Sequence, residues 1–404
     1  MQQKKLIFTL ISGMVALLVA MGIGRFAYTP LLPYMQQSQG FSETMAGYLA
    51  SSNYLGYLLG AVLTGAVRWR NKRTLFFQMG LLANILTTGL MGSTADEWLW
   101  LLWRFLSGIS SAMVLVLASG IVLDQLAKYQ RVTWAGLFYG GVGWGIFFSG
   151  LFVPYLVQWL EWDGAWFGLM IFSLLIGLPS FFGLRETNLP NQSLTVETSS
   201  EETPNADKKQ LGWLMAAYGC EGLGYIITGT FLVAIAANIP TLAHNPTLSW
   251  IVAGLAAIPS CIIWAWIAKH WGYSITLILA YLLQAIGVLL PVLLTNAMGI
   301  YIGSFLFGGT FMGITTLVTS MGQKMYPQES SRVIGYLTAV YGIGQILGPL
   351  GAGILAEKTH SYASSLVGAT GIILLGMAFI IVQALQHTRK NRRYPYGLAS
   401  DEIN

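Results

Sequence analysis

Three charged residues lie inside long apolar stretches, where an unpaired charge is costly. Arg25 lies near the end of the first stretch, Arg104 in the fourth and Glu221 in the seventh. Two arginines that face one cavity would suit a carboxylate or another anion, because a guanidinium forms forked hydrogen bonds with such groups. Burial favours the neutral form of the Glu221 carboxyl and a nearby arginine favours its charged form, so this residue is a candidate for proton coupling.

Each of the three residues also has a structural interpretation. Arg25 lies about two turns from the end of its apolar stretch, so its side chain could reach the lipid headgroups. The Arg104 guanidinium could tie its helix to backbone carbonyls of the first helix. Glu221 could form a fixed ion pair with either arginine. The sequence leaves these alternatives open.

Weaker candidates for a binding site lie in or beside glycine-rich parts of the apolar stretches. Such side chains could line an amphipathic pocket, although aromatic residues also serve as packing or interfacial anchors. These residues are Tyr28, Tyr139, Trp144, Tyr225, Tyr341 and Gln345.

The sequence offers no conventional cofactor or metal chemistry. Cys220 and Cys261 lie in apolar stretches without the spacing of a metal site, and the four histidines lie at or beyond the ends of such stretches. The GxG pattern that begins at Gly22 has no preceding strand, so close helix packing explains it better than nucleotide binding. We therefore expect no cofactor and no metal.

Composition indicates an integral membrane protein. Of the 404 residues, 55% are hydrophobic and only 9% are charged, and the mean hydropathy is +0.62. A soluble domain carries about 25% charged residues. The net charge of +5 comes from basic residues next to apolar stretches, a pattern typical of membrane topology, so we expect a lipid bilayer and no nucleic acid as partner.

Twelve apolar stretches joined by short turns predict an all-α bundle of transmembrane helices. The first stretch has a basic start, but it is too long for a signal peptide core and is expected to be retained. The predicted spans are about 6–28, 45–67, 74–93, 98–124, 134–157, 164–184, 211–236, 249–269, 273–294, 298–321, 334–356 and 362–385.

Basic residues predict the orientation of the spans. All but three of the 21 Lys and Arg residues fall in the termini or in alternate loops on one side, and Arg25, Arg104 and Lys358 are the exceptions. Because cytoplasmic loops are enriched in Lys and Arg, both termini are expected in the cytoplasm.

One long polar stretch divides the chain in two. Residues 185–210 are acidic, rich in Ser and Thr and poor in apolar residues, which predicts a flexible cytoplasmic linker. The expected organisation is a six-helix half over 1–184, a second half over 211–388 and a basic cytoplasmic tail over 389–404.

The two halves resemble each other. Gly22-Ile23-Gly24 matches Gly222-Leu223-Gly224, and the segment 104–108 matches 304–308, both at an offset of 200 residues. Two matches at one offset in equivalent spans indicate a duplicated six-helix unit.

Twelve spans in two repeated halves around a central linker resemble the major facilitator superfamily. The segments GIGRFAYTPLLPYM (22–35), RFLSG (104–108) and YGCEGLGYIITGTFL (218–232) look like its YbfB/YjiJ branch more specifically. The loop after Gly65 keeps the basic residues of the superfamily's GxxxDRxGRR pattern but lacks the aspartate, which leaves the usual charge relay at this loop in doubt.

The resemblance implies an all-α integral membrane protein with twelve transmembrane helices in two pseudo-symmetric halves, with spans 1, 4, 7 and 10 around a central cavity. It also implies a secondary active transporter that works by alternating access in the plasma (inner) membrane, as a monomer. We expect a small organic substrate, anionic or amphipathic, and coupling to protons. A passive facilitator or channel is the main alternative, and a membrane-embedded enzyme or sensor is a further one, disfavoured by the lack of a catalytic cluster.

Overall fold

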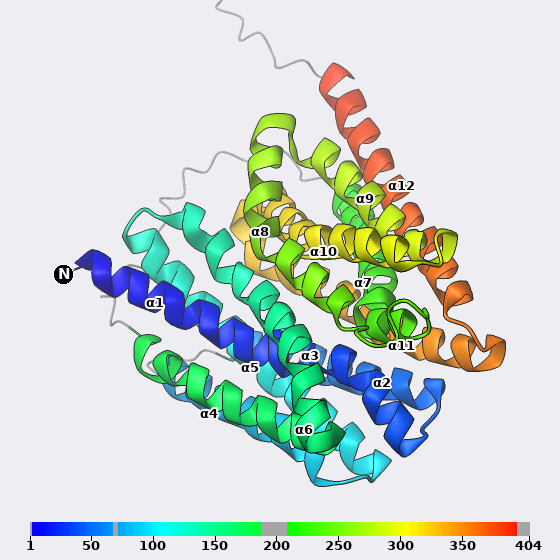
Figure 1. The fold of residues 1–404 in the computed structure, drawn as a ribbon. Coiled ribbons are helices and arrows are strands. Elements are labelled where there is room, and N and C mark those ends of the chain that lie inside the picture. The colour runs from blue at the N-terminus through cyan, green and yellow to red at the C-terminus, as the bar shows by residue number, and fades with distance from the viewer. Residues whose placement is uncertain (1, 68–71, 187–207, 394–404) are drawn as a thin grey trace, which may run out of the picture.

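The computed structural model describes residues 2–67, 72–186 and 208–393, and within these ranges it contains helices and turns but no strand. The helices run side by side through the molecule in alternating directions (Figure 1). The all-α fold predicted from the apolar stretches is therefore confirmed.

Each predicted span corresponds to a helical segment. In the first half these are α1 (Gln2–Leu17), the π-helix η1 (Leu18–Ile23), α2 (Tyr28–Gln39), α3 (Glu43–Ala66), α4 (Arg73–Leu90), α5 (Glu97–Lys128) and α6 (Ala135–Gly183). In the second half they are α7 (Lys208–Ala237), α8 (Leu248–Trp271), α9 (Tyr273–Leu293), α10 (Ala297–Met325), α11 (Ser330–Thr359) and α12 (Ala363–Arg393). Short 3-10 turns, η2 (Met91–Ser93), η3 (Val132–Trp134) and η4 (Pro327–Glu329), join some of them.

Length and composition alone identify ten helical stretches in the described residues that could cross a membrane. The stretch that contains α6 covers two predicted spans, because Glu161 has a non-helical backbone (φ 62°) and breaks α6 in the middle. Helix α3 has 24 residues but is not among the ten. Ser51, Ser52 and Asn53 lie in its middle and lower its hydropathy.

The predicted end of the first span was wrong. The helical stretch continues from Gln3 to Gln39, over 37 residues, and is interrupted rather than ended near Gly24. Arg25 therefore lies deep inside the span and not about two turns from its end.

Contacts around the paired glycines follow the internal repeat. A Cβ added at Gly22 would collide with the Cα of Gly145, and one added at Gly222 would collide with the carbonyl oxygen of Tyr341. The first and fifth predicted spans are thus in backbone contact, as are the seventh and eleventh. These contacts explain why glycine occupies both positions.

The two halves meet along α3 and α11 and along α6 and α8. A Cβ at Gly47 on α3 would collide with the carbonyl oxygen of Pro349 on α11, and one at Gly254 on α8 would collide with the backbone nitrogen of Phe147 on α6. Small residues therefore let the halves approach to backbone contact on both sides of the molecule.

The halves are closed against each other at the end of the bundle opposite the termini. The Tyr362 hydroxyl donates to the Glu43 carboxylate, and the Thr44 N–H donates to Glu357 Oε2 at 3.0 Å. Deeper inside, the Ser51 hydroxyl donates to the Ile346 carbonyl at 2.7 Å.

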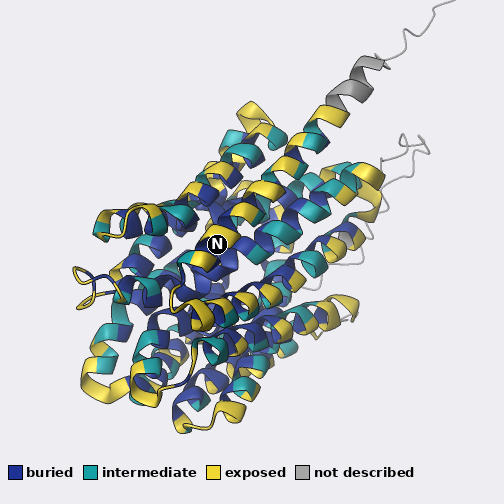
Figure 2. Cartoon of the chain, turned by 90° about the vertical axis from the view of Figure 1, so that its right-hand side faces the viewer, coloured by how far each residue is buried: buried dark blue, intermediate teal, exposed yellow. Residues whose placement is uncertain are grey.

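Toward the other end of the bundle the facing helices are less buried. Met215 and Gly219 on α7 and Val340 on α11 are half-buried, whereas 224–234, farther along α7, are buried throughout. Buried residues fill the middle of the bundle and exposed ones gather toward the ends and the outer face (Figure 2). The interface between the halves is thus tighter at the end away from the termini.

The first residues of the predicted linker are docked. Glu186 follows α6, and its N–H donates to the Thr74 hydroxyl at 2.8 Å while its carboxylate lies 3.7 Å from Arg73 Nε. Arg73 also pairs with Asp124 at 2.9 Å. These contacts join α4, α5 and α6 beside the loop that lacks the superfamily aspartate. The rest of the linker up to 207 and the tail from 394 lie outside the described residues, and α12 continues to Arg393, past the expected boundary at 388.

The orientation can be tested with single cysteines in a chain whose two native cysteines are replaced by serine. His244 and Lys128 are both exposed, at opposite ends of the bundle. We expect an impermeant maleimide to label His244→Cys in intact cells and Lys128→Cys only after permeabilisation, because basic loops stay in the cytoplasm. The reverse labelling pattern would contradict the predicted orientation.

Candidate functional site

The first span is interrupted next to Arg25. The Gly24 N–H donates to the Val19 carbonyl at 2.8 Å and the Phe26 N–H to the Met21 carbonyl at 3.2 Å, both across five residues instead of four. The Thr29 N–H donates to the Phe26 carbonyl at 3.2 Å instead of to Arg25, and the carbonyls of Gly24 and Arg25 find no backbone partner in the described structure. Such interruptions expose backbone groups that side chains must satisfy.

Arg104 satisfies these carbonyls. Its Nη1 donates to the Gly24 carbonyl at 3.5 Å, its Nη2 to the Arg25 carbonyl at 3.2 Å and its Nε to the Leu49 carbonyl at 3.4 Å. The Ser107 hydroxyl also donates to the Gly24 carbonyl, at 3.0 Å. All three nitrogens of Arg104 are thus engaged by backbone, as in the structural interpretation of this residue.

Tyr28 belongs to the same arrangement. The Arg104 Cζ lies 4.7 Å from the centre of the Tyr28 ring, and the Tyr28 hydroxyl donates to the Ala46 carbonyl at 3.0 Å. The Asn53 amide donates to the Arg104 carbonyl at 2.9 Å. We call Arg104, Tyr28 and Ser107 the clamp, because together they hold the interrupted segment against α3 and α5.

Arg25 is buried, with 3% of its surface exposed, so the alternative in which its side chain reaches the lipid headgroups does not fit the structure. Its Cζ lies 4.0 Å from the centre of the Tyr57 ring, 4.8 Å from Tyr54 and 5.2 Å from Phe26. Its Nε and Nη2 have no hydrogen-bond partner within the described structure. Aromatic faces compensate part of the cost of burying this cation, but they leave two donors unused.

No carboxylate of the described residues pairs with Arg25. The ion pairs there are Arg73 with Asp124, Arg73 with Glu186 and Arg332 with Glu329, all at least partly exposed. A buried cation without a counter-ion costs several kcal/mol, on the order of 3–5 when a partner has been removed. An anion from outside the protein would remove this cost.

Tyr225, Tyr341 and Gln345 of the second half lie close to the group around Arg25. Phe26, whose ring centre is 5.2 Å from the Arg25 Cζ, meets Phe311 edge to face at 6.4 Å. Phe311 stacks on Tyr225, which stacks on Tyr341. The Gln345 amide donates to the Tyr225 hydroxyl at 2.5 Å, while the Gln345 Oε1 has no partner in the described structure. The structure thus places four of the predicted site residues in one region between the halves.

Glu221 lies within the second half and is fully buried. Gln284 on α9 donates to its Oε1 at 3.1 Å, and the remaining oxygens, Glu221 Oε2 and Gln284 Oε1, have no partner in the described residues. Neither arginine pairs with Glu221, so the fixed ion pair considered from the sequence is not what the structure contains.

Two predicted site residues lie elsewhere. Trp144 stacks on Phe148 and meets Phe147 edge to face, both on its own helix. Tyr139 packs against Phe138 at 4.9 Å between ring centres. Neither ring belongs to the group around Arg25.

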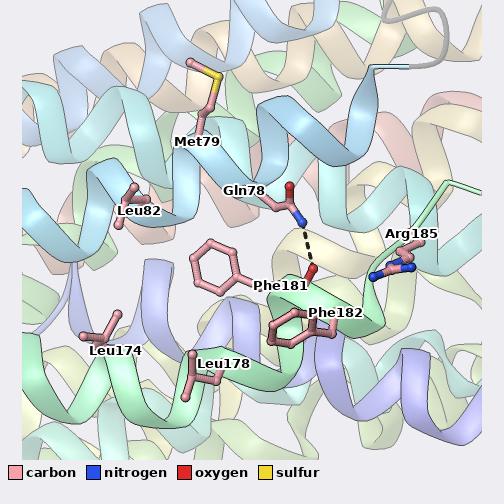
Figure 3. A pocket seen from close by; sticks show the side chains of 8 residues that line it. All are labelled: Gln78, Met79, Leu82, Leu174, Leu178, Phe181, Phe182 and Arg185. Atoms are coloured by element: carbon pink, nitrogen blue, oxygen red, sulfur yellow. Dashed lines mark hydrogen bonds between the residues drawn. The ribbon is translucent and has the colours of Figure 1, made fainter.

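A surface groove of about 480 Å³ lies apart from these residues, between α4 and the end of α6 (Figure 3). The Gln78 amide donates to the Phe181 carbonyl at its edge, at 2.8 Å. Its other lining residues are mostly exposed and apolar, as expected for a lipid-facing surface: Met79, Leu82, Leu174, Leu178, Phe182, and Arg185 at one end.

Sequence reasoning missed Tyr54, Tyr57 and Gln284. The two tyrosines are one helical turn apart on the helix with the most polar middle, which is a signal for a face turned toward a site. Gln284 lies 200 residues after Asn84, and both are buried amides in equivalent spans. The internal repeat could therefore have identified it.

Comparisons with known proteins agree with this architecture. The family model described as "Uncharacterised MFS-type transporter YbfB" matches residues 17–383. The chain belongs to this family of major facilitator transporters. The resemblance found in the sequence is confirmed, and this chain is a multi-pass membrane transporter rather than an enzyme.

Relatives and a solved structure resemble this transporter over almost its whole length. An uncharacterized MFS-type transporter of Yersinia pestis (strain Pestoides F) is 24% identical and covers 91% of this chain and 92% of its own. The MFS-type transporter YceJ of Bacillus subtilis (strain 168) is also 24% identical, covering 93% and 96%. The crystal structure of a point mutant of the nucleoside transporter NupG has a TM-score of 0.73 at 14% identity over 94% of this chain and 99% of its own, which shows a shared fold.

The clamp can be tested through stability. We expect Arg104→Lys to destabilise the protein, because one ammonium cannot reach all three carbonyls and each buried acceptor left unpaired costs about 1–3 kcal/mol. Arg73→Lys, at a half-exposed ion pair, should cost less than about 1 kcal/mol. Thermal unfolding in detergent measures both, and an unchanged melting temperature for Arg104→Lys would contradict the clamp.

Proposed function

We propose that this transporter moves a small organic anion across the membrane by alternating access. Arg25 is the observation that carries the proposal: it is a buried cation between the halves, without a counter-ion in the described structure. Its two unpartnered nitrogens, Nε and Nη2, lie on the same edge of the guanidinium. That edge binds a carboxylate by two parallel hydrogen bonds, so we propose Arg25 as the anion-binding residue.

The asymmetry of the interface supports alternating access. Contacts of Glu43 with Tyr362 and of Thr44 with Glu357 close one end, while the facing helices are half-buried toward the other end. With the termini in the cytoplasm, this conformation would be closed to the outside and looser toward the cytoplasm. A substrate bound between the halves would then exchange with one compartment at a time.

Proton coupling through Glu221 is part of the proposal. A carboxylic acid and a primary amide can form two hydrogen bonds with each other, one in each direction. Glu221 and Gln284 already form one of these bonds, and each retains one unpaired oxygen. A proton on Glu221 Oε2 would supply the second bond to Gln284 Oε1, so we propose that the neutral acid is the form present in this conformation.

Tyr225 and Tyr341 connect the two proposed sites. Tyr225 lies one helical turn after Glu221 on α7, and its ring stacks on Tyr341 at 5.6 Å between ring centres. An anion at Arg25 would change the potential at these rings and thereby the affinity of Glu221 for its proton. We propose this as the physical basis of coupling.

Charge placement supports the proposed setting in the plasma (inner) membrane with both termini in the cytoplasm, where we propose that the chain works as a monomer. The end of the bundle away from the termini carries acidic residues instead of basic ones: Glu43, Asp96, Glu97, Glu161, Asp163 and Glu357, with Lys358 as the basic exception. A passive facilitator would share this topology, but it would not accumulate substrate when driven by a proton gradient.

The arginine can be tested by conservative substitution. We expect Arg25→Lys to keep a positive charge but weaken carboxylate binding by about tenfold or more, because a lysine ammonium cannot form the two parallel hydrogen bonds of a guanidinium. The melting temperature without ligand should change little, because Arg25 makes few hydrogen bonds that would be lost. Ligand titration followed by thermal shift measures both, and unchanged affinity for every carboxylate would remove the anion site.

Glu221→Gln tests proton coupling. We expect proteoliposomes with this variant to lose accumulation driven by a pH gradient and to retain exchange of substrate for substrate, because the amide holds the bond to Gln284 but carries no exchangeable charge. Tyr281→Phe is a matched control, since it alters a buried polar group on the same helix as Gln284 and leaves the Glu221 carboxyl intact. Accumulation that survives in Glu221→Gln would end the proton assignment.

A further inference from the structure

We infer that the anion carried at Arg25 is a flat aromatic carboxylate with a hydroxyl or amino group on its ring. This inference rests on the proposed function and names its substrate class. Three features of the region between the halves support it: the free edge of Arg25, a stack of nearly parallel rings beside it, and an unpaired acceptor on Gln345.

The stack is built from side chains of three helices. Tyr218 and Tyr341 lie 4.2 Å apart between ring centres with planes inclined by 18°, and Tyr341 and Tyr225 lie 5.6 Å apart at 13°. Tyr225 and Phe311 lie 5.7 Å apart at only 7°. These rings come from α7, α10 and α11, and at most 8% of any of them is exposed.

Parallel ring faces on different helices suit a flat ligand. Movement of the halves would part Phe26 of the first half from Phe311 of the second, whose rings meet edge to face at 6.4 Å, and an aromatic ring could take the place beside the stack. It would replace the lost contact with Phe311, worth about 0.5–1.5 kcal/mol beyond the area it buries. A saturated ring of the same size is not flat and lacks the π-faces for this contact.

The carboxylate end of the ligand is set by Arg25. The Tyr57 and Tyr54 rings pack against its guanidinium, and the edge with Nε and Nη2 has no hydrogen-bond partner in the described residues, so we infer that this edge is the place for an anion. The guanidinium of Arg104 is engaged with backbone carbonyls, so it offers no second free edge for an anion. A single free guanidinium edge matches one carboxylate better than a multiply charged phosphate ester.

The opposite end of the ligand is set by Gln345. Its Nε2 is used by the Tyr225 hydroxyl, but its Oε1 is buried and has no donor in the described part of the chain. A buried acceptor without a donor is unfavourable, and a ring hydroxyl or amino group would satisfy it. Tyr225 bonds to Gln345 and stacks on Phe311, and Phe311 meets Phe26 beside Arg25, so we infer that a single aromatic acid can address both.

The test compares three carboxylates of similar size by calorimetric titration of the full-length protein in detergent: 4-hydroxybenzoate, benzoate and cyclohexanecarboxylate. We expect 4-hydroxybenzoate to bind about three- to tenfold more tightly than benzoate, through the donor to Gln345. Benzoate should bind about two- to tenfold more tightly than cyclohexanecarboxylate, through ring stacking.

Variants assign these preferences to residues. Gln345→Met should abolish the advantage of 4-hydroxybenzoate over benzoate, and Tyr225→Leu should reduce the advantage of benzoate over cyclohexanecarboxylate. Trp144→Leu is the matched control: it removes an aromatic ring outside the group and should leave both ratios unchanged. The comparison uses the ratio of the affinities for two carboxylates in the same variant. A general loss of affinity or stability lowers both affinities and leaves this ratio unchanged.

Two outcomes would overturn the inference in distinguishable ways. Equal affinity for benzoate and cyclohexanecarboxylate would reject the aromatic class while leaving an anion transporter intact. Failure of all three carboxylates to bind a protein that unfolds cooperatively would reject both the aromatic class and the anion site at Arg25.

Discussion

The interruption of the first span at Gly24 to Ala27 is the constraint on which the site depends. A continuous helix would use the carbonyls of Gly24 and Arg25 itself, and it would leave Arg104 buried with Nε bonded to Leu49 but with both terminal nitrogens unpaired. The broken helix instead gives Arg104 its acceptors, and the clamp fixes the segment that carries Arg25. The two arginines thus have different tasks. Arg104 satisfies the backbone, and the free edge of Arg25 becomes available because Arg104 does so.

In the proposed mechanism, separation of the buried charges gives the two halves different roles. Arg25 lies in the first half among Tyr54, Tyr57 and Phe26, and Glu221 lies in the second half against Gln284. A direct ion pair between them would hold the halves together and would oppose a change of access. Without it, the substrate and the proton can supply the missing partners. The substrate and the proton would then each shift the equilibrium toward the conformation that binds them more tightly.

The sequence was sufficient for the fold because hydrophobic length, basic loops and an internal repeat are strong signals. It also singled out Arg25, Glu221, Tyr225, Tyr341 and Gln345. It could not reveal the broken helix, since Gly24 and Pro30 are compatible with both a continuous and an interrupted span. For the same reason the task of Arg104 could not be decided. Trp144 and Tyr139 pack against rings of their own helix, and glycine-rich spacing does not say which face of a helix meets the site.

The central claim is that a carboxylate from outside the protein is the counter-ion of Arg25, and a structure with a heavy-atom-labelled ligand tests it most directly. We expect crystals or cryo-EM maps obtained with 4-iodobenzoate to show its carboxylate within hydrogen-bond distance of Arg25 Nε and Nη2, with the iodine signal among Tyr225, Tyr341 and Phe311. Arg25→Gln should lose that signal. Iodine density that persists elsewhere while Arg25 remains unpaired, or a map in which Arg25 pairs with Glu221, would contradict the claim.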